Sequence, residues 1–147
     1  MPDIFDLYIP NKDGKKSLYR LELLGDGIGS TILSLYHRRI EERKAKSGKV
    51  RQVRTYGFCF ECETGKLTYA SVHTGDFTKP HFRWLDSREE QFEAEKIPGV
   101  CYIQAVRYVE RVCAFLDDEK EKASTYKERD RCELFLSPLE KILGWGK

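Results

Sequence analysis

In the C-terminal half of the chain, residues 97–120 form the pattern that most restricts the fold. At the 100° per residue of an α-helix, most of their apolar side chains fall on one arc. That arc contains Tyr102, Ala105, Val106, Val109, Val112, Cys113 and Leu116. The polar residues Gln104, Arg107 and Arg111 fall opposite it. Since a one-sided helix buries its apolar side against the rest of the chain, this segment predicts a core helix.

The middle of the chain predicts a β-hairpin. Residues 54–62 and 66–73 are rich in aromatic and β-branched side chains, and a Glu-Thr-Gly-Lys turn joins them. Because side chains alternate along a strand, Tyr56, Phe58 and Phe60 share one face.

The other elements follow from shorter patterns. Residues 3–10 alternate as a strand does, whereas residues 17–24 and 31–40 fit a helix or a strand equally well. We expect a helix beginning at Asp86 and Ser87, a last strand over 132–138 and a short helix capped by Ser137. The chain therefore predicts one α+β domain over residues 1–147. A small antiparallel sheet, made of N-terminal strands and the central hairpin, packs against C-terminal helices.

Composition narrows the class of protein. The 147 residues include 26 basic and 24 acidic ones, so the formal net charge is only +2. The first ten residues carry two aspartates instead of the basic start of a signal peptide, and no apolar run reaches the ~20 residues of a spanning helix. We expect a soluble, cytoplasmic protein with no membrane partner. Its five cysteines are expected to stay thiols.

Catalytic and cofactor motifs are weak. The Gly-Asp-Gly-Ile-Gly-Ser-Thr stretch at 25–31 has Ser30 where a dinucleotide fingerprint needs its third glycine, so it predicts a turn. No catalytic pattern surrounds the three histidines. Cys59 and Cys62 have the spacing of half a zinc site, and whether they bind metal stays open. We expect a non-catalytic protein with no cofactor and no metal site.

The most informative local feature is a basic segment over residues 38–54. It contains eight basic residues and two glutamates, so its net charge is 8 − 2 = +6 over 17 residues. The basic residues are Arg38, Arg39, Arg43, Lys44, Lys46, Lys49, Arg51 and Arg54. Elsewhere the chain is net acidic, and residues 86–96 alone carry 5 − 2 = 3 excess negative charges. Such segregation favours contact with a polyanion.

The strand after this segment resembles the longer ribonucleoprotein motif of the RNA-recognition motif family. Arg54, Tyr56, Gly57 and Phe58 match that motif, and residues 7–11 resemble the shorter motif of the same family. The resemblance implies a helix over 16–27, a strand over 31–40, and Tyr8, Tyr56 and Phe58 as platforms on which bases stack. It ends at residue 61, because a hairpin is predicted where that family has its second helix. We therefore assign the chain to no family.

These observations predict a small binding protein that contacts nucleic acid through residues 38–60. RNA or single strands are favoured, because Tyr56 and Phe58 are predicted to stack on bases beside the eight basic residues. The alternative is a protein-interaction module, an inhibitor or adaptor that acts on a nucleic-acid-handling machine. Its surface would be the acidic region from Asp86 to Glu121 or the basic segment itself.

Overall fold

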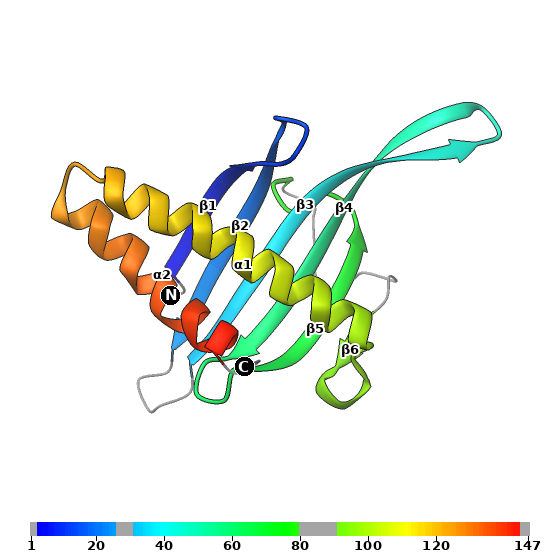
Figure 1. Cartoon of the computed structure of the whole chain (residues 1–147). Helices are drawn as coiled ribbons and strands as arrows, with labels where there is room; N and C mark the ends of the chain where they lie inside the picture. Colours follow the sequence, from blue (N-terminus) through cyan, green and yellow to red (C-terminus); the bar gives the residue numbers. More distant parts are fainter. Residues whose placement is uncertain (1–2, 26–30, 80–90, 145–147) are drawn as a thin grey trace.

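A six-stranded antiparallel sheet followed by two helices forms the protein (Figure 1). The computed structural model describes residues 3–25, 31–79 and 91–144. The strands are β1 (Asp3–Pro10), β2 (Lys16–Gly25), β3 (Thr31–Ala45), β4 (Gly48–Glu61), β5 (Lys66–Thr74) and β6 (Gln91–Glu93). A 3₁₀ turn (Ala94–Lys96) leads into α1 (Gly99–Lys122) and α2 (Tyr126–Gly144). Each strand pairs with the next one in sequence. The expected α+β fold is confirmed.

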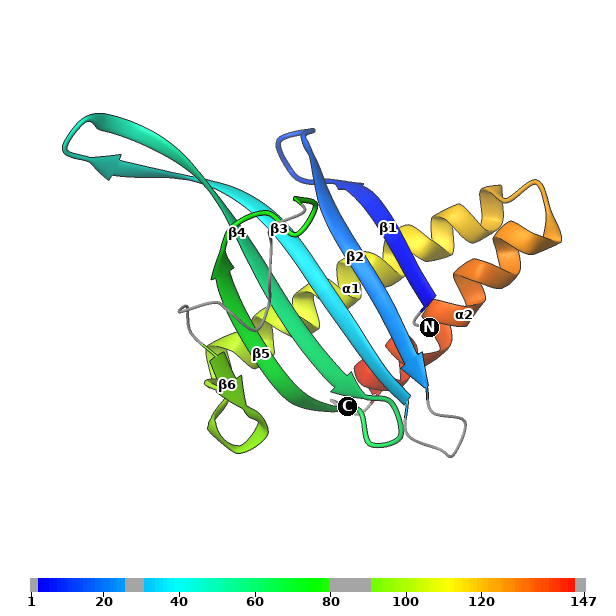
Figure 2. The ribbon, with the colours of Figure 1, turned by 180° about the vertical axis from the view of Figure 1, so that it is seen from behind.

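Both helices cover one face of the sheet, and α1 crosses the strands diagonally (Figures 1 and 2). The core lies in this layer because alternate strand residues point toward the helices. Leu35 on β3 is paired with Phe58 on β4, and both are buried with Val109 of α1. Neither helix in the described part of the chain is long and apolar enough to span a membrane.

Residues 17–24 and 31–40, which the pattern alone left open, are strands. Tyr19 lies opposite Leu7 on β1 and Leu21 lies opposite Leu35 on β3, and all four side chains are buried. The helix over 16–27 implied by the RNA-recognition motif is wrong, because residues 16–25 form β2. Each of these strands pairs with a strand on both sides, so its alternate apolar residues fall on the one face that the helices cover.

The C-terminal expectations need a larger correction. The strand expected over 132–138 is wrong, because α2 runs through it without a break. The buried side chains of α2 are Cys132, Phe135, Leu136, Leu139 and Ile142, which is helical spacing. Pro138 lies inside this helix and does not begin a new one. The carbonyl of residue 134, which loses its hydrogen bond to Pro138, belongs to the exposed side of α2.

The segment before α1 also differs from expectation. Residues 91–93 form β6 and residues 94–96 a 3₁₀ turn, where a helix was expected. The expected helix start at Asp86 and Ser87 lies outside the described residues. The core helix itself is confirmed as α1, although its buried side includes Tyr108, whereas Tyr102 is 38% exposed.

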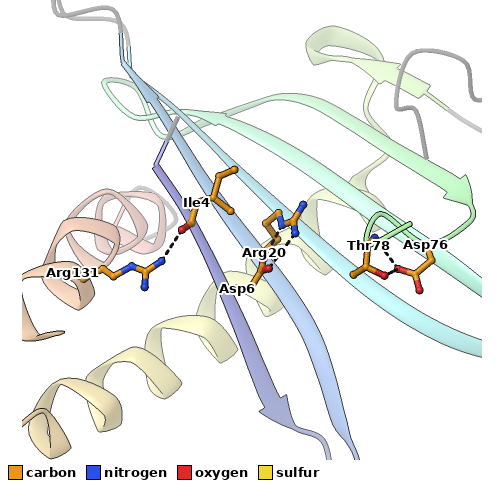
Figure 3. Close-up of polar contacts among 6 residues, drawn as sticks. All are labelled: Ile4, Asp6, Arg20, Asp76, Thr78 and Arg131. Carbon is orange, nitrogen blue, oxygen red and sulfur yellow. Dashed lines mark hydrogen bonds and ion pairs between the residues drawn. The ribbon is translucent and has the colours of Figure 1, made fainter. Parts of the chain in front are cut away.

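Strand β1 forms one edge of the sheet, and α2 holds it in place. The Arg131 side chain donates a 2.7 Å hydrogen bond to the carbonyl oxygen of Ile4 (Figure 3). The same guanidinium lies 4.1 Å from the ring centre of Phe5, which also packs against Phe135. The side chain of Arg131 thus takes up one carbonyl of a strand edge that could otherwise pair with another chain.

Candidate nucleic-acid interface

Strands β3 and β4 extend past the rest of the sheet as a two-stranded ribbon, which we define as residues 38–54 (Figures 1 and 2). Pairing between β2 and β3 stops at Arg38, and pairing between β4 and β5 stops at Arg54. Beyond these two residues, β3 and β4 form strand pairs only with each other in the described part of the chain, apart from one hydrogen bond from the Gly75 N–H to the Val53 carbonyl. All eight basic residues singled out in the sequence therefore belong to one projecting element.

The outer half of the ribbon carries exposed cations. Lys44, Lys46, Lys49 and Arg51 are all exposed, and no described carboxylate lies within ion-pairing distance of them. Lys44 and Lys49 are directly opposite each other. The ribbon reverses at a turn that ends in Gly48, whose φ of +111° strongly favours glycine. The side chain of Arg43 lies outside the described part of the structure.

The inner half of the ribbon pairs its cations with acids. Arg38 forms a 3.1 Å ion pair with Asp76, whose carboxylate also accepts hydrogen bonds from the Thr78 backbone and hydroxyl (Figure 3 shows Asp76 and Thr78). Burial acts to raise the pKa of Asp76, but these hydrogen bonds and the Arg38 charge outweigh it, so the pKa lies below its usual value. The structure thus divides the basic segment into a base whose arginines have acidic partners and a tip whose Lys44, Lys46, Lys49 and Arg51 have no carboxylate partner among the described residues.

Glu41 lies between Arg39 and Arg54 in the base of the ribbon. Its carboxylate is 3.6 Å from Nε of Arg39 and 3.8 Å from Nε of Arg54, and it accepts a 2.7 Å hydrogen bond from the Tyr56 hydroxyl. Burial, together with the Glu41 hydrogen bond and charge, raises the pKa of Tyr56, so its hydroxyl stays a donor. In the sequence, Glu41 appears only as a reduction of the net charge of the basic segment, and its position between two arginines depends on the register of β3 and β4.

The aromatic part of the predicted interface needs correction. Phe58 is 2% exposed and Phe60 is fully buried, because both side chains point toward α1. The expectation that Phe58 stacks on bases is wrong, since a ring enclosed by Leu35 and Tyr108 cannot reach a ligand. Tyr56 is half-buried and shares its face with Phe58, so only part of its ring is at the surface. Tyr8, which is 55% exposed, lies on the edge strand β1, three strands away from β4 in the sheet.

Beneath the base of the ribbon lies a buried aromatic group around His37. The imidazole stacks on Tyr19 at 4.3 Å and meets the edge of Tyr108 of α1 at 4.6 Å. Neither ring nitrogen has a hydrogen-bond partner among the residues that the structure describes. Burial, assisted by the charges of Arg111 and Arg39, lowers the pKa of His37 to about 3, so the ring is neutral. Sequence patterns did not identify this group, because α1 is remote from β3 in the chain.

The two candidate zinc ligands point to opposite sides of the sheet. Cys59 lies 3.3 Å from the Ser34 hydroxyl, whereas Cys62 lines a groove with Leu134 and Pro138 of α2. Burial raises the pKa of both thiols. In the described ranges, no cluster of three or more histidine, cysteine or carboxylate side chains is arranged to hold a metal ion.

Comparisons with protein-family models, curated proteins and solved structures find no match to this chain. The RNA-recognition-motif resemblance therefore gains no support from a family match, and the strand order also departs from it.

Proposed function

We propose that the protein binds nucleic acid through the ribbon, which acts as a positively charged arm. The observation that carries this proposal is the exposed set of Lys44, Lys46, Lys49 and Arg51 on an element that pairs with no third strand among the described residues. Each lysine or arginine that neutralises a phosphate releases condensed counterions, which supplies affinity without sequence readout. A projecting arm brings these cations to a ligand without steric hindrance from the body of the sheet.

The shape of the ribbon favours duplex DNA over the RNA or single strand that the sequence suggested. With Phe58 enclosed in the core, base stacking on that ring no longer supports single-strand binding. The major groove of B-form DNA is about 12 Å wide and admits a two-stranded β-ribbon. The major groove of A-form RNA is deep and narrow, so it excludes such an element. The ligand proposed here is therefore double-stranded DNA.

The test removes the four tip charges together. A Lys44→Gln, Lys46→Gln, Lys49→Gln, Arg51→Gln variant is titrated with a labelled duplex at several salt concentrations, and fluorescence anisotropy reports binding. If each side chain neutralises one phosphate, the log–log salt slope becomes less negative by about 3.6 in total. Affinity at low salt falls by a factor of at least about 100.

A matched control removes the same charge elsewhere. The control changes four exposed lysines outside the ribbon to glutamine: Lys12, Lys15, Lys16 and Lys127. This control variant has the same net charge as the tip variant. Equal loss of affinity in both variants would reject the ribbon as the binding surface. No duplex binding by the unaltered protein would reject the function, and tighter binding of a single strand or RNA would reject the preference for duplex DNA.

One observation supports a protein partner as a second candidate. At the start of α1, Val100 is 75% exposed and Ile103 is 55% exposed, and the two lie one turn apart. Exposed apolar side chains next to each other mark protein contacts more often than isolated ones do. If this candidate is correct, a partner captured after nuclease treatment is lost with Val100→Asp and Ile103→Asp but kept by the tip variant.

A further inference from the structure

Helix α1 has two acidic side chains on the flank that packs against α2. Burial, together with the charges of Asp117, Glu140 and Glu110, raises the pKa of the Cys113 thiol to about 12. Since Glu140 belongs to α2, the two acids of α1 lie near this thiol on the side where the helices meet. Figure 1 shows α2 on the side of α1 away from the ribbon. These two carboxylates are therefore directed away from the ribbon.

The opposite flank of α1 carries two arginines. Arg107 and Arg111 are one turn apart, and both are exposed. Arg111 donates a 3.1 Å hydrogen bond to the hydroxyl of Tyr19, whose ring stacks on His37 beneath the base of the ribbon. None of the described carboxylates lies within ion-pairing distance of either guanidinium group. The two charges are thus not neutralised by a described acid, and Arg111 is held beside the ribbon base.

Arg39 connects this flank with the ribbon. It follows His37 on the face of β3 that points toward the helices, and 54% of its side chain is exposed. Burial raises the pKa of the Tyr19 hydroxyl, whereas the charges of Arg111 and Arg39 act to lower it, so both guanidinium groups lie near this oxygen. Positively charged side chains therefore extend from the base of the ribbon onto α1.

The ribbon tip presents its cations on the other face. Lys44 and Lys49 are directly opposite each other, and the alternation of side chains places them, with Arg51, on the face that points away from the helices. The major groove of duplex DNA is about 12 Å wide and has a phosphate backbone along each side. An arm inside this groove has one backbone next to each of its faces. Cations on both faces can therefore contact both backbones.

We infer that Arg107 and Arg111 bind the phosphate backbone on the helix side of the groove that the ribbon enters. The ligand is the sugar-phosphate backbone of double-stranded DNA, so the inference rests on the proposed function and extends it from the ribbon to α1. A guanidinium group matches a phosphate through two parallel hydrogen bonds. Phosphate contacts of this kind fix the orientation of a protein on the duplex. Helix α1 thus determines how the arm lies in the groove.

The first experiment removes both arginines of α1. A variant with Arg107→Gln and Arg111→Gln is titrated with a labelled duplex at several salt concentrations, and fluorescence anisotropy reports binding. If each arginine neutralises one phosphate, the log–log salt slope becomes less negative by about 1.8, and affinity at low salt falls about 10-fold.

The matched control removes two exposed cations of α2. A variant with Lys127→Gln and Arg129→Gln has the same net charge as the α1 variant. Its affinity is expected to fall by about 2-fold or less, as the general effect of a lower net charge. An equal loss of affinity in the two double variants would overturn the inference.

Single variants separate binding from folding, because Arg111 also holds the buried hydroxyl of Tyr19. Arg107 is exposed, so Arg107→Gln should change Tm by about 1 °C or less and still make the salt slope less negative by about 0.9. Arg111→Lys keeps the positive charge, so it should retain most of the slope even where its Tm falls. An unchanged slope in Arg107→Gln would overturn the contact from α1.

The second experiment combines the α1 variant with the tip variant. Because the two sets of cations are proposed to contact different backbones, their effects on the salt slope should add to a change of about 5.4. A combined change no larger than that of the tip variant alone would overturn the inference.

These titrations also separate the inference from the proposed function. Loss of affinity in the tip variant alone rejects the contact from α1 and leaves the ribbon as the binding surface. Loss in the α1 variant alone supports the contact from α1 and rejects the ribbon. No duplex binding by the unaltered protein rejects both.

Discussion

The two halves of the β3–β4 hairpin share one hydrogen-bonded ladder but differ in almost everything else. In the half that lies within the sheet, Leu33, Leu35, Phe58 and Phe60 are buried against α1 and the neighbouring strands. In the ribbon, the same alternation places charged side chains on both faces, and within residues 3–25, 31–79 and 91–144 no further strand pairs with it beyond Arg38 and Arg54. The sheet half is held by apolar burial, and the ribbon by its own ladder.

This difference separates stability from binding. Since apolar burial supplies most of the driving force for folding, substitutions in the sheet half should cost stability. Substitutions at the ribbon tip remove little burial, so their effect should appear in ligand binding. Four measurements test this division, beginning with the largest expected effect.

Truncation in the sheet half should be severe. Phe60 is fully buried, so Phe60→Ala leaves a cavity and is expected to lower the free energy of unfolding by about 3–5 kcal/mol. Urea unfolding followed by circular dichroism measures the change. Val50→Ala in the ribbon, where the side chain is 45% exposed, is the control. An equal decrease in the free energy of unfolding for Phe60→Ala and Val50→Ala would show that apolar burial does not distinguish the sheet half from the ribbon.

Acid should weaken the protein where the ribbon meets the sheet. The pKa of His37 is about 3 in the folded protein and near 6.5 when unfolded, so the unfolded chain binds the extra proton first as pH falls. The contribution of neutral His37 is complete above pH 6.5 and is lost at roughly 1.4 kcal/mol per pH unit down to pH 3.

The matched variant is His37→Phe, which keeps an aromatic ring next to Tyr19 and cannot titrate. Between pH 6.5 and 4.5, the unaltered protein should lose about 2.3 kcal/mol more stability than this variant. Urea unfolding at each pH provides the comparison. Parallel pH curves for the two proteins would contradict a buried neutral imidazole.

A smaller effect is expected from one hydrogen bond at the junction of the two halves. The buried Thr55 hydroxyl donates a 2.7 Å bond to the carbonyl of Gly75, whose N–H in turn donates to the carbonyl of Val53. Thr55→Val keeps the shape and removes the donor, at a cost of about 1–2 kcal/mol. Thr55→Ser keeps the donor, so a larger loss for serine than for valine would show that packing, and not the hydrogen bond, dominates.

The smallest change in stability should come from the ribbon tip. Arg51 is exposed, and Arg51→Gln should shift Tm by about 1 °C or less. The same variant should lower duplex affinity and make the salt slope less negative by about 0.9. A decrease in Tm of several degrees would show that the tip stabilises the fold. It would contradict the division of stability and binding between the two halves of the hairpin.

Elements that carry their own pattern could be predicted from the sequence. Helix α1 and the central hairpin each have enough alternating or helical apolar residues to define their faces. Helix α2 could not, because Ser137 and Pro138 are typical of a helix start and the apolar run before them fits a strand. In the structure, Phe135 and Leu139 are buried on the same side of α2, and this burial stabilises one continuous helix.

The candidate site divides in the same way. The eight basic residues and their concentration in one segment are visible in the sequence, and the structure places them on one ribbon. The enclosure of Phe58 and the position of Glu41 between two arginines are not visible there. They depend on which face of the ladder α1 covers and on which residues the register places opposite each other.

The order of charges along the chain and the period of its apolar residues are local properties, so the amino-acid sequence by itself determined the cationic segment, the core helix and the α+β class. Which rings are buried, which cations have acidic partners and where β3 and β4 leave the sheet were decided only by the tertiary structure. The physical reason is that burial and ion pairing depend on distances between residues far apart in the chain. Those distances exist only once the strands are in register and the helices cover one face.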